Sequence, residues 1–131
     1  MSIRIASCSC GKLKARVEGE PVRVSICHCL ACQRRTGSAF GEQARFPRKQ
    51  VVIAGTSTEY VRLGDEGSKI RFHFCPACGS TVYYESEGLD EFIAIPVGAF
   101  ADPTFPAPVF SVYEGRMHSW VIPPEGAEHF A

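Results

Sequence analysis

The sequence has 131 residues, and its 14 lysines and arginines balance 14 aspartates and glutamates, so the formal net charge is zero. This balance lacks the basic excess of proteins that bind nucleic-acid phosphates, and we expect no nucleic-acid partner. Nowhere do about 18 apolar residues run together, and residues 1–7 lack the apolar core of a signal peptide, so we expect no membrane partner. Length and composition predict a single cytoplasmic domain over residues 1–131 and leave its oligomeric state open.

Alternating apolar residues predict short antiparallel strands, and we expect a mainly β fold with little helix. The residues that share a face in this pattern are Leu13, Ala15 and Val17; Phe40, Ala44 and Phe46; Ile70, Phe72 and Phe74; and Val82 and Tyr84. Turns are expected at residues 19–21, 46–47, 55–56, 64–67 and 88–90, where glycine or proline interrupts the pattern. Residues 30–36 could form one or two helical turns, and the five prolines from Pro103 to Pro124 keep much of the last third irregular.

Seven cysteines stand in three tight groups, which is the main chemical signal of the sequence. The groups are Cys8 and Cys10; Cys27, Cys29 and Cys32; and Cys75 and Cys78. In a cytosolic chain such spacing favours metal ligation over disulfides. A structural zinc takes four protein ligands, whereas a catalytic zinc keeps three and leaves one position open. Seven cysteines therefore predict one zinc of each kind.

The pair Cys75 and Cys78 has the features of a zinc knuckle. Pro76 sets the first turn position, and Gly79 can adopt the left-handed conformation that aims backbone N–H groups at sulfur. A knuckle supplies two ligands, and a strand that carries Cys8 and Cys10 would place both of their side chains on one face. We therefore expect these four cysteines to hold the structural zinc.

The remaining group can form a tripod with an open coordination position. Three thiolates on zinc leave a net charge near minus one, and a thiol could complete the tetrahedron in its deprotonated form, so the implied chemistry is thiol capture. The count also fits another partition, in which Cys29 and Cys32 join the knuckle while Cys8, Cys10 and Cys27 form the tripod. A plainer interpretation is one or two structural zincs, with His28 or His73 as the eighth ligand and no chemistry.

The other candidate residues carry weaker signals. His28 lies between two ligands and should point away from their sulfurs, His73 lies among aromatics, and His118 and His129 fall in the irregular tail, so we expect packed or surface histidines. Arg34 and Arg35 are either solvated or able to grip the carboxylates of a ligand. A tight turn at residues 36–38 could direct backbone N–H groups at the tripod sulfurs.

Three segments of the sequence resemble the glutathione-dependent formaldehyde-activating enzyme family. They are Cys10-Gly11, the run from Cys27 to Ser38, and the run from Phe74 to Ser80, with weaker similarity over residues 97–103 and at Trp120. The resemblance implies a zinc-stabilised β-tent fold, with Cys8, Cys10, Cys75 and Cys78 as structural ligands and Cys27, Cys29 and Cys32 as catalytic-zinc ligands. It also implies a carbon–sulfur lyase whose small-molecule partners are a thiol and an aldehyde, interconverting formaldehyde and glutathione with S-hydroxymethylglutathione.

Two other functions deserve comparison with this one. A branch of the same family resembling centromere protein V suggests a non-enzymatic, zinc-stabilised binding module, although the balanced charge and the lack of a basic arm argue against it here. A β-tent reductase would need a cysteine nucleophile, and all seven cysteines already have expected ligand roles.

Overall fold

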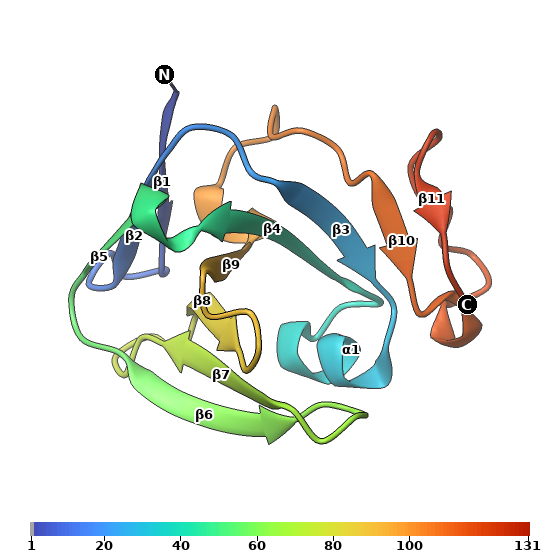
Figure 1. The fold of residues 1–131 in the computed structure, drawn as a ribbon, viewed down its shortest axis with the longest axis horizontal. Coiled ribbons are helices and arrows are strands. Elements are labelled where there is room, and N and C mark those ends of the chain that lie inside the picture. The colour runs from blue at the N-terminus through green and yellow to red at the C-terminus, as the bar shows by residue number, and fades with distance from the viewer. Residues whose placement is uncertain (1) are drawn as a thin grey trace.

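The computed structural model describes residues 2–131 and has a mainly β fold in which two sheets pack around a core (Figure 1). The strands are β1 (Ile3–Ser7), β2 (Lys14–Glu18), β3 (Arg23–Cys27), β4 (Gly41–Pro47), β5 (Val51–Ala54), β6 (Thr58–Leu63), β7 (Lys69–Phe74), β8 (Thr81–Ser86), β9 (Phe92–Pro96), β10 (Phe110–Val112) and β11 (Glu128–His129). The helices are α1 (Leu30–Thr36) and the short 3₁₀ segments η1 (Arg48–Gln50), η2 (Val97–Phe100) and η3 (Glu114–Arg116).

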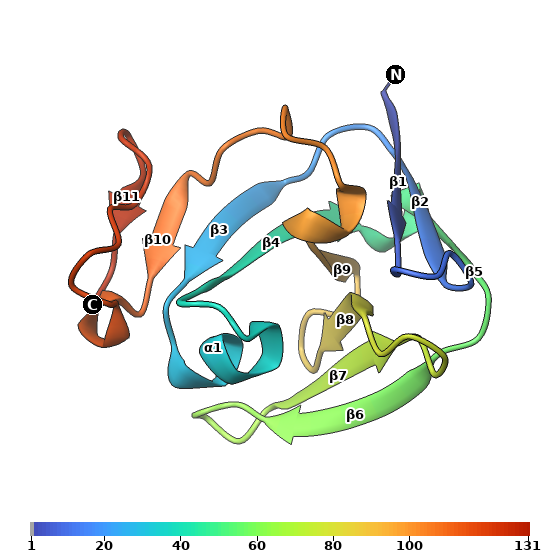
Figure 2. The same ribbon diagram turned by 180° about the vertical axis from the view of Figure 1, so that it is seen from behind.

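The smaller sheet has the order β1-β2-β5 and is antiparallel throughout. The larger sheet has the order β11-β10-β3-β4-β9-β8-β7-β6, in which β10 runs parallel to β3 and to β11 while the other pairs are antiparallel. Views from the front and from behind both place the smaller sheet and β11 at opposite ends of the molecule (Figures 1 and 2). Both views also show that the larger sheet curls, so that β3 and the β6–β7 hairpin lie on either side of α1.

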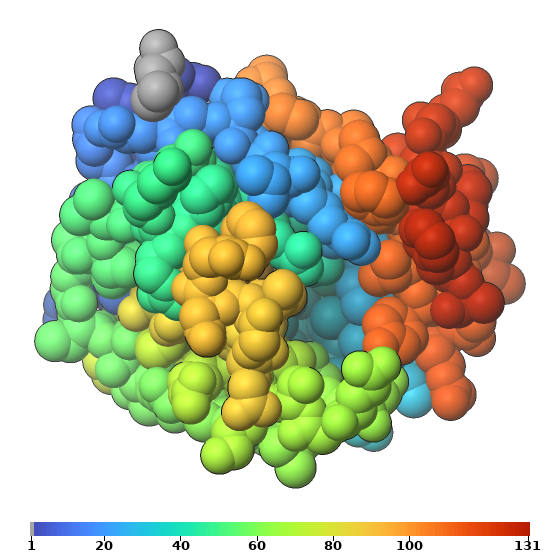
Figure 3. Space-filling model, in the orientation of Figure 1, coloured from blue at the N-terminus to red at the C-terminus, as the bar shows by residue number. Residues whose placement is uncertain are grey.

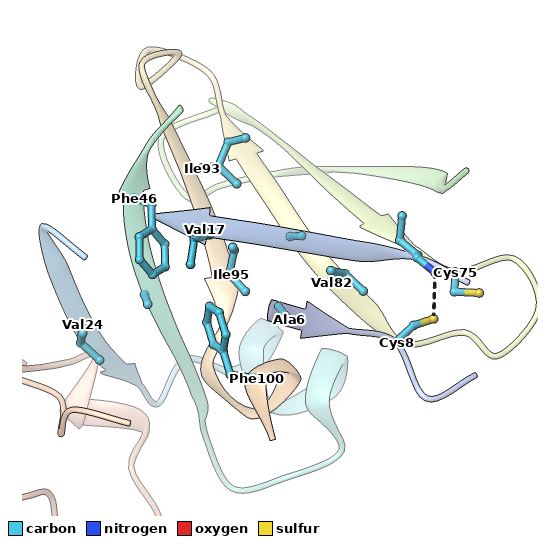
Figure 4. Close-up of a cluster of buried hydrophobic side chains, with 13 residues drawn as sticks. Ala6, Cys8, Val17, Val24, Phe46, Cys75, Val82, Ile93, Ile95 and Phe100 are labelled. Carbon is cyan, nitrogen blue, oxygen red and sulfur yellow. Dashed lines mark hydrogen bonds between the residues drawn. The ribbon is translucent and has the colours of Figure 1, made fainter. Parts of the chain in front are cut away.

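The core lies between the two sheets and follows from the period-two pattern of the strands. Ala15 and Val17 of β2, and Leu13 just before it, lie on one face and are fully buried, as expected from their alternation. They meet Phe46 of β4 and Ile95 of β9, which are also fully buried. Figure 4 shows this cluster, with Cys8 and Cys75 at one end of it. The core therefore fixes two of the cysteines by ordinary hydrophobic packing.

The expected fold class is confirmed, and the helical turns expected at residues 30–36 are α1. The turn expected at Phe46-Pro47 is wrong, because β4 continues through both residues and Pro47 lies opposite Phe92 of β9. A strand tolerates proline at its last residue because the ladder needs no further N–H donor there. Among residues 2–131, none of the helices combines the length and the apolar character that crossing a membrane requires.

Candidate functional site

The structure brings Cys8, Cys10, Cys75 and Cys78 together at one end of the core. The sulfur of Cys10 lies 3.7 Å from that of Cys8 and 3.6 Å from that of Cys75. A tetrahedron with zinc–sulfur bonds of about 2.3 Å has sulfur–sulfur edges of roughly 3.8 Å, so this spacing fits zinc. No cysteine of the described chain is in a disulfide. Four thiolates in this arrangement suit a closed, structural site.

Two turns rather than a strand and a turn present these four sulfurs, so the expected strand-borne Cys8 and Cys10 are wrong. Residues 8–10 follow the end of β1, and Gly11 has φ +83°, with its N–H donating to the carbonyl of Cys8. The N–H of Leu13 donates to the Cys8 sulfur at 3.2 Å. The chain bends here because Gly11 can adopt a left-handed conformation that other residues avoid.

The second turn has the predicted knuckle geometry. Gly79 has φ +81°, and its N–H donates to the carbonyl of Cys75 at 2.8 Å. The N–H of Ala77 points to the Cys75 sulfur at 3.4 Å. Hydrogen bonds from backbone N–H groups, chiefly that of Ser80, lower the pKa of Cys78 to about 5. An ionised sulfur is the form that a metal binds.

Cys27, Cys29 and Cys32 form a second cluster, which spans the end of β3 and the start of α1. Cys27 is the last residue of β3, Cys29 is the N-cap of α1, and Cys32 lies in the first turn of the helix. The three sulfurs lie within 4.8 Å of one another. The N–H of Cys32 donates to the Cys29 sulfur at 3.3 Å, which sets the cap. We call these three residues the tripod.

The ionisation of the tripod sulfurs is strongly interdependent. The neighbouring Cys27 thiol, with help from Cys29, Arg35 and Arg62, lowers the pKa of Cys32 to about 6. The pKa of Cys27 is raised, first by its interaction with Cys32 and then by burial. One of these sulfurs ionises easily and its neighbour does so only with difficulty, because like charges crowd together. A divalent cation among them removes that conflict, so the donor set fits zinc.

The geometry excludes the alternative partition of the cysteines. Cys29 and Cys32 lie with Cys27 and not with the knuckle, and Cys8 and Cys10 lie with Cys75 and Cys78. Within residues 2–131, no histidine joins either cluster as an eighth ligand.

The histidines are packed or exposed, as expected. His28 is fully buried, with its Nε2 3.0 Å from the Ser111 hydroxyl. His73 stacks on Tyr83 at 4.2 Å between ring centroids, and its Nε2 lies 2.9 Å from Glu85. His118 and His129 are exposed.

The turn after α1 is present but has another role than expected. The N–H of Gly37 donates to the carbonyl of Gln33, and the N–H of Ser38 donates to the Thr36 hydroxyl. The Thr36 hydroxyl in turn donates to the Cys32 carbonyl at 2.9 Å. These N–H groups therefore cap the helix rather than contact the tripod sulfurs.

The tripod lies in the wall of a cavity of about 450 Å³. Figure 3 shows this hollow in the face of the molecule, with atoms of α1 at its floor between β3 and the loop that follows β6. Its apolar wall includes Ile70, Phe72 and Val112. Its charged groups are four arginines and one aspartate, namely Arg35, Arg45, Arg62, Arg116 and Asp65. The cavity therefore places the three tripod sulfurs beside four arginines.

Of the two arginines considered from the sequence, only Arg35 lines this cavity, whereas Arg34 is exposed to solvent. The Arg35 guanidinium lies 5.5 Å from the ring centres of both Phe72 and Tyr84. One of its terminal nitrogens is buried without a hydrogen-bond partner in the described chain. Of the two alternatives considered from the sequence, solvation describes Arg34, whereas Arg35 is placed where it could grip a ligand carboxylate.

Sequence analysis missed the cavity residues outside the cysteine segments. Gln43 and Arg45 occupy the polar positions of β4, Arg62 lies on β6, and Tyr84 lies on β8. Burial raises the pKa of Tyr84, so its phenol stays neutral. For Gln43, Arg45 and Arg62 the only signal was a polar position in a strand, which normally indicates a solvent-facing side, and Tyr84 was expected only as part of an apolar face.

Comparison with known proteins adds a family and a fold. The family model described as glutathione-dependent formaldehyde-activating enzyme matches residues 3–116. No functionally curated protein matches the chain. A crystal structure of a Rhodobacter sphaeroides protein is 18% identical and covers 97% of this chain and 99% of its own, with a TM-score of 0.58. That likeness concerns the fold.

Proposed function

The chain belongs to the glutathione-dependent formaldehyde-activating enzyme family, and from this premise we propose that it is a zinc-dependent carbon–sulfur lyase. It forms or cleaves an adduct of a glutathione-type thiol with an aldehyde, such as S-hydroxymethylglutathione. The observation that carries the proposal is the position of the tripod in the wall of a cationic cavity. A purely structural metal site needs neither an open face nor a cavity beside it.

Each cysteine cluster takes a separate role in this proposal. Cys8, Cys10, Cys75 and Cys78 hold a structural zinc, and Cys27, Cys29 and Cys32 hold a catalytic one. Zinc bound to three thiolates supplies a position at which a fourth sulfur is ionised near neutral pH. The tripod residues fix that position against the cavity, because two of them belong to α1 and its cap while Cys27 is anchored in β3.

The reaction itself demands little of the protein. The thiol sulfur bonds to the aldehyde carbon, the carbonyl double bond opens, and the thiol proton ends on the new hydroxyl oxygen. The cationic side chains, Arg35, Arg62 and Arg116 among them, attract an anionic thiol into the cavity. The apolar wall limits the positions that the aldehyde can take. Orientation and an available thiolate are the main contributions, since thiols and formaldehyde combine unaided.

Exchange spectroscopy by NMR tests the activity directly. The rate at which formaldehyde and glutathione interconvert with S-hydroxymethylglutathione is measured without protein, with the wild type and with Cys29→Ser. We expect the wild type to accelerate exchange and Cys29→Ser to reduce the rate to the spontaneous value while remaining folded. Wild-type exchange no faster than the spontaneous reaction would favour the alternative, a zinc-stabilised binding module without catalysis.

Elemental analysis of the same samples tests the metal assignment. We expect two zinc ions per chain in the wild type and one in Cys29→Ser. The matched variant Cys78→Ser should lose stability instead, because metal binding at a closed structural site contributes directly to folding. One zinc in both wild type and Cys29→Ser would contradict a metal at the tripod.

A further inference from the structure

The face of the larger sheet that carries Cys27 also carries a row of polar residues leading away from it. Side chains alternate along β3, so Arg23, Ser25 and Cys27 share one face. Their partners on β4 are Arg45, Gln43 and Gly41, respectively. The pair Arg23 and Arg45 therefore lies four residues along the strand from the tripod, about 13 Å between α-carbons.

Arg23 and Arg45 form an uncompensated pair of positive charges. Like charges directly opposite each other in an antiparallel sheet are destabilising. Within the described residues, neither guanidinium has a carboxylate within ion-pair distance. Arg23 lies over the ring of Phe110 at 4.3 Å, and Arg45 lies over that of Phe92 at 5.7 Å. Burial and the charge of Arg23 lower the pKa of Arg45. An anion between them would relieve this repulsion.

Gln43 lies between the arginine pair and the tripod and has an unused acceptor. Its Nε2 donates to the hydroxyl of the buried Ser25 at 2.8 Å. Its Oε1 is buried and has no hydrogen-bond partner in residues 2–131. A buried acceptor without a donor costs free energy, so this atom is satisfied only when something else donates to it. A ligand N–H would do so.

The two positions lie in hollows that share part of their lining. A smaller hollow of about 130 Å³ is lined by Arg23 and Ser25. It shares Gln43, Arg45, Tyr84 and Val112 with the cavity beside the tripod. A ligand in the hollow visible in Figure 3 therefore meets the tripod and Arg45, and Arg23 lines the neighbouring hollow beside Arg45.

We propose that Arg23 and Arg45 form a carboxylate subsite and that Gln43 accepts a hydrogen bond from a ligand amide. The subsite selects thiols of peptide character, with a carboxylate two to three residue lengths from the sulfur. An extended chain covers roughly 3.3 to 3.6 Å per residue, and the arginine side chains close the remaining distance. The sulfur position in this inference rests on the proposed function, whereas the carboxylate subsite does not.

The first experiment uses a ligand without sulfur and so does not depend on the tripod. Isothermal titration calorimetry measures the binding of γ-glutamyl-alanyl-glycine and of its diethyl ester to the zinc-loaded wild-type protein. Loss of a charge-assisted hydrogen bond weakens binding by roughly tenfold to a hundredfold, and we expect that difference between acid and ester. Equal binding of the two forms would overturn the subsite without any variant having to fold.

Variants then locate the subsite. Arg45→Gln and Arg23→Gln should each weaken binding of the acid by about tenfold or more and leave the weak binding of the ester unchanged. Arg71→Gln is the matched control, because Arg71 lies on β7 and pairs with Glu59 at 3.7 Å, away from the cavity. If Arg71→Gln weakens binding of the acid as much as Arg45→Gln does, the effect comes from the overall charge of the protein, and the proposed subsite is wrong.

Thiol ligands separate the two proposals. Arg45→Gln should weaken glutathione binding and leave that of 2-mercaptoethanol unchanged, because the latter has no carboxylate. Cys29→Ser should bind neither glutathione nor 2-mercaptoethanol. It should still bind the sulfur-free peptide acid more tightly than the diethyl ester. Unchanged thiol binding in Cys29→Ser would contradict the proposed function alone. If the wild-type protein binds inorganic phosphate but not the peptide acid, the assignment of the subsite to a carboxylate is wrong.

Discussion

Gly41 is the residue whose substitution tests most directly how β4 sets the tripod geometry. It lies opposite Cys27 in the β3–β4 ladder and is buried. A Cβ atom at this position would lie 3.2 Å from a terminal nitrogen of Arg35 and 3.3 Å from the Cβ of Cys32. Ordinary contacts between carbon atoms are about 3.5 to 4.0 Å, so Gly41→Ala must displace at least one neighbour by a few tenths of an ångström.

Neither neighbour moves freely. Arg35 lies over two aromatic rings, and Cys32 is held by the backbone of α1. Overpacking of this kind costs about 1–3 kcal/mol. We expect this strain to act on the metal-bound state, in which Cys32 is held close to Cys27. At about 1.4 kcal/mol per factor of ten, the strain then lowers the zinc affinity of the tripod by roughly 5-fold to 140-fold. The cluster of Cys8, Cys10, Cys75 and Cys78 contains neither Arg35 nor Cys32, and we expect its zinc affinity to be unchanged.

A competition titration with a chromophoric chelator measures both zinc affinities in wild type and Gly41→Ala. Gly98→Ala is the control, because a Cβ there meets no heavy atom of residues 2–131 within 4 Å and the residue lacks a positive φ. We expect one weakened site in Gly41→Ala and none in Gly98→Ala. Two zinc ions bound by Gly41→Ala with wild-type affinities would refute the reasoning, since Cys32 would then have room that the structure denies it.

Three further predictions concern the core and the cluster of Cys8, Cys10, Cys75 and Cys78. Phe46→Ala removes a fully buried ring and should cost about 3–5 kcal/mol, seen as a lower urea midpoint; an unchanged midpoint would contradict its central position. Gly55→Ala places a Cβ 2.0 Å from the Lys12 carbonyl oxygen and should destabilise far more than Gly67→Ala, which shares a positive φ but meets nothing within 4 Å; equal thermal midpoints would exclude the clash. A chelator should lower the thermal midpoint of wild type, because free zinc at 100 times its Kd contributes about 2.7 kcal/mol, and Cys78→Ser should lack this response; a midpoint insensitive to chelator in wild type would argue against structural zinc.

The three cysteine groups could be predicted because their signal is local in sequence, whereas the fold decides that Cys8 and Cys10 join Cys75 and Cys78. Ligands two or three residues apart can converge on one metal, whatever fold surrounds them. The same holds for α1, which begins at a cysteine cap and ends at Gly37 with φ +67°. The conformation of residues 8–10 was less constrained, since a spacing of two fits both a strand and a turn. Gly11 was the one residue that indicated the turn.

The cavity could not be predicted because it depends on which strands are neighbours. A period of two assigns side chains to faces, but it does not say which strand lies beside which. β10 pairs in parallel with β3 from more than 80 residues away and brings Val112 to Cys27. Arg45 occupies a polar position that normally faces solvent, and only the curl of the sheet around α1 turns that face into a cavity wall.

The sequence separations within the two clusters give them different consequences for the fold. Cys10 and Cys75 are 65 residues apart, so a metal between them closes a long loop and ties the smaller sheet to β7. Closing such a loop removes much conformational entropy from the unfolded chain, so losing that metal should affect folding as a whole. The tripod spans only the six residues from Cys27 to Cys32, and a metal there constrains little that β3 and α1 do not already fix. A metal at the tripod would therefore exchange at small cost to the fold, and this cluster, not the other, borders the cavity lined by four arginines.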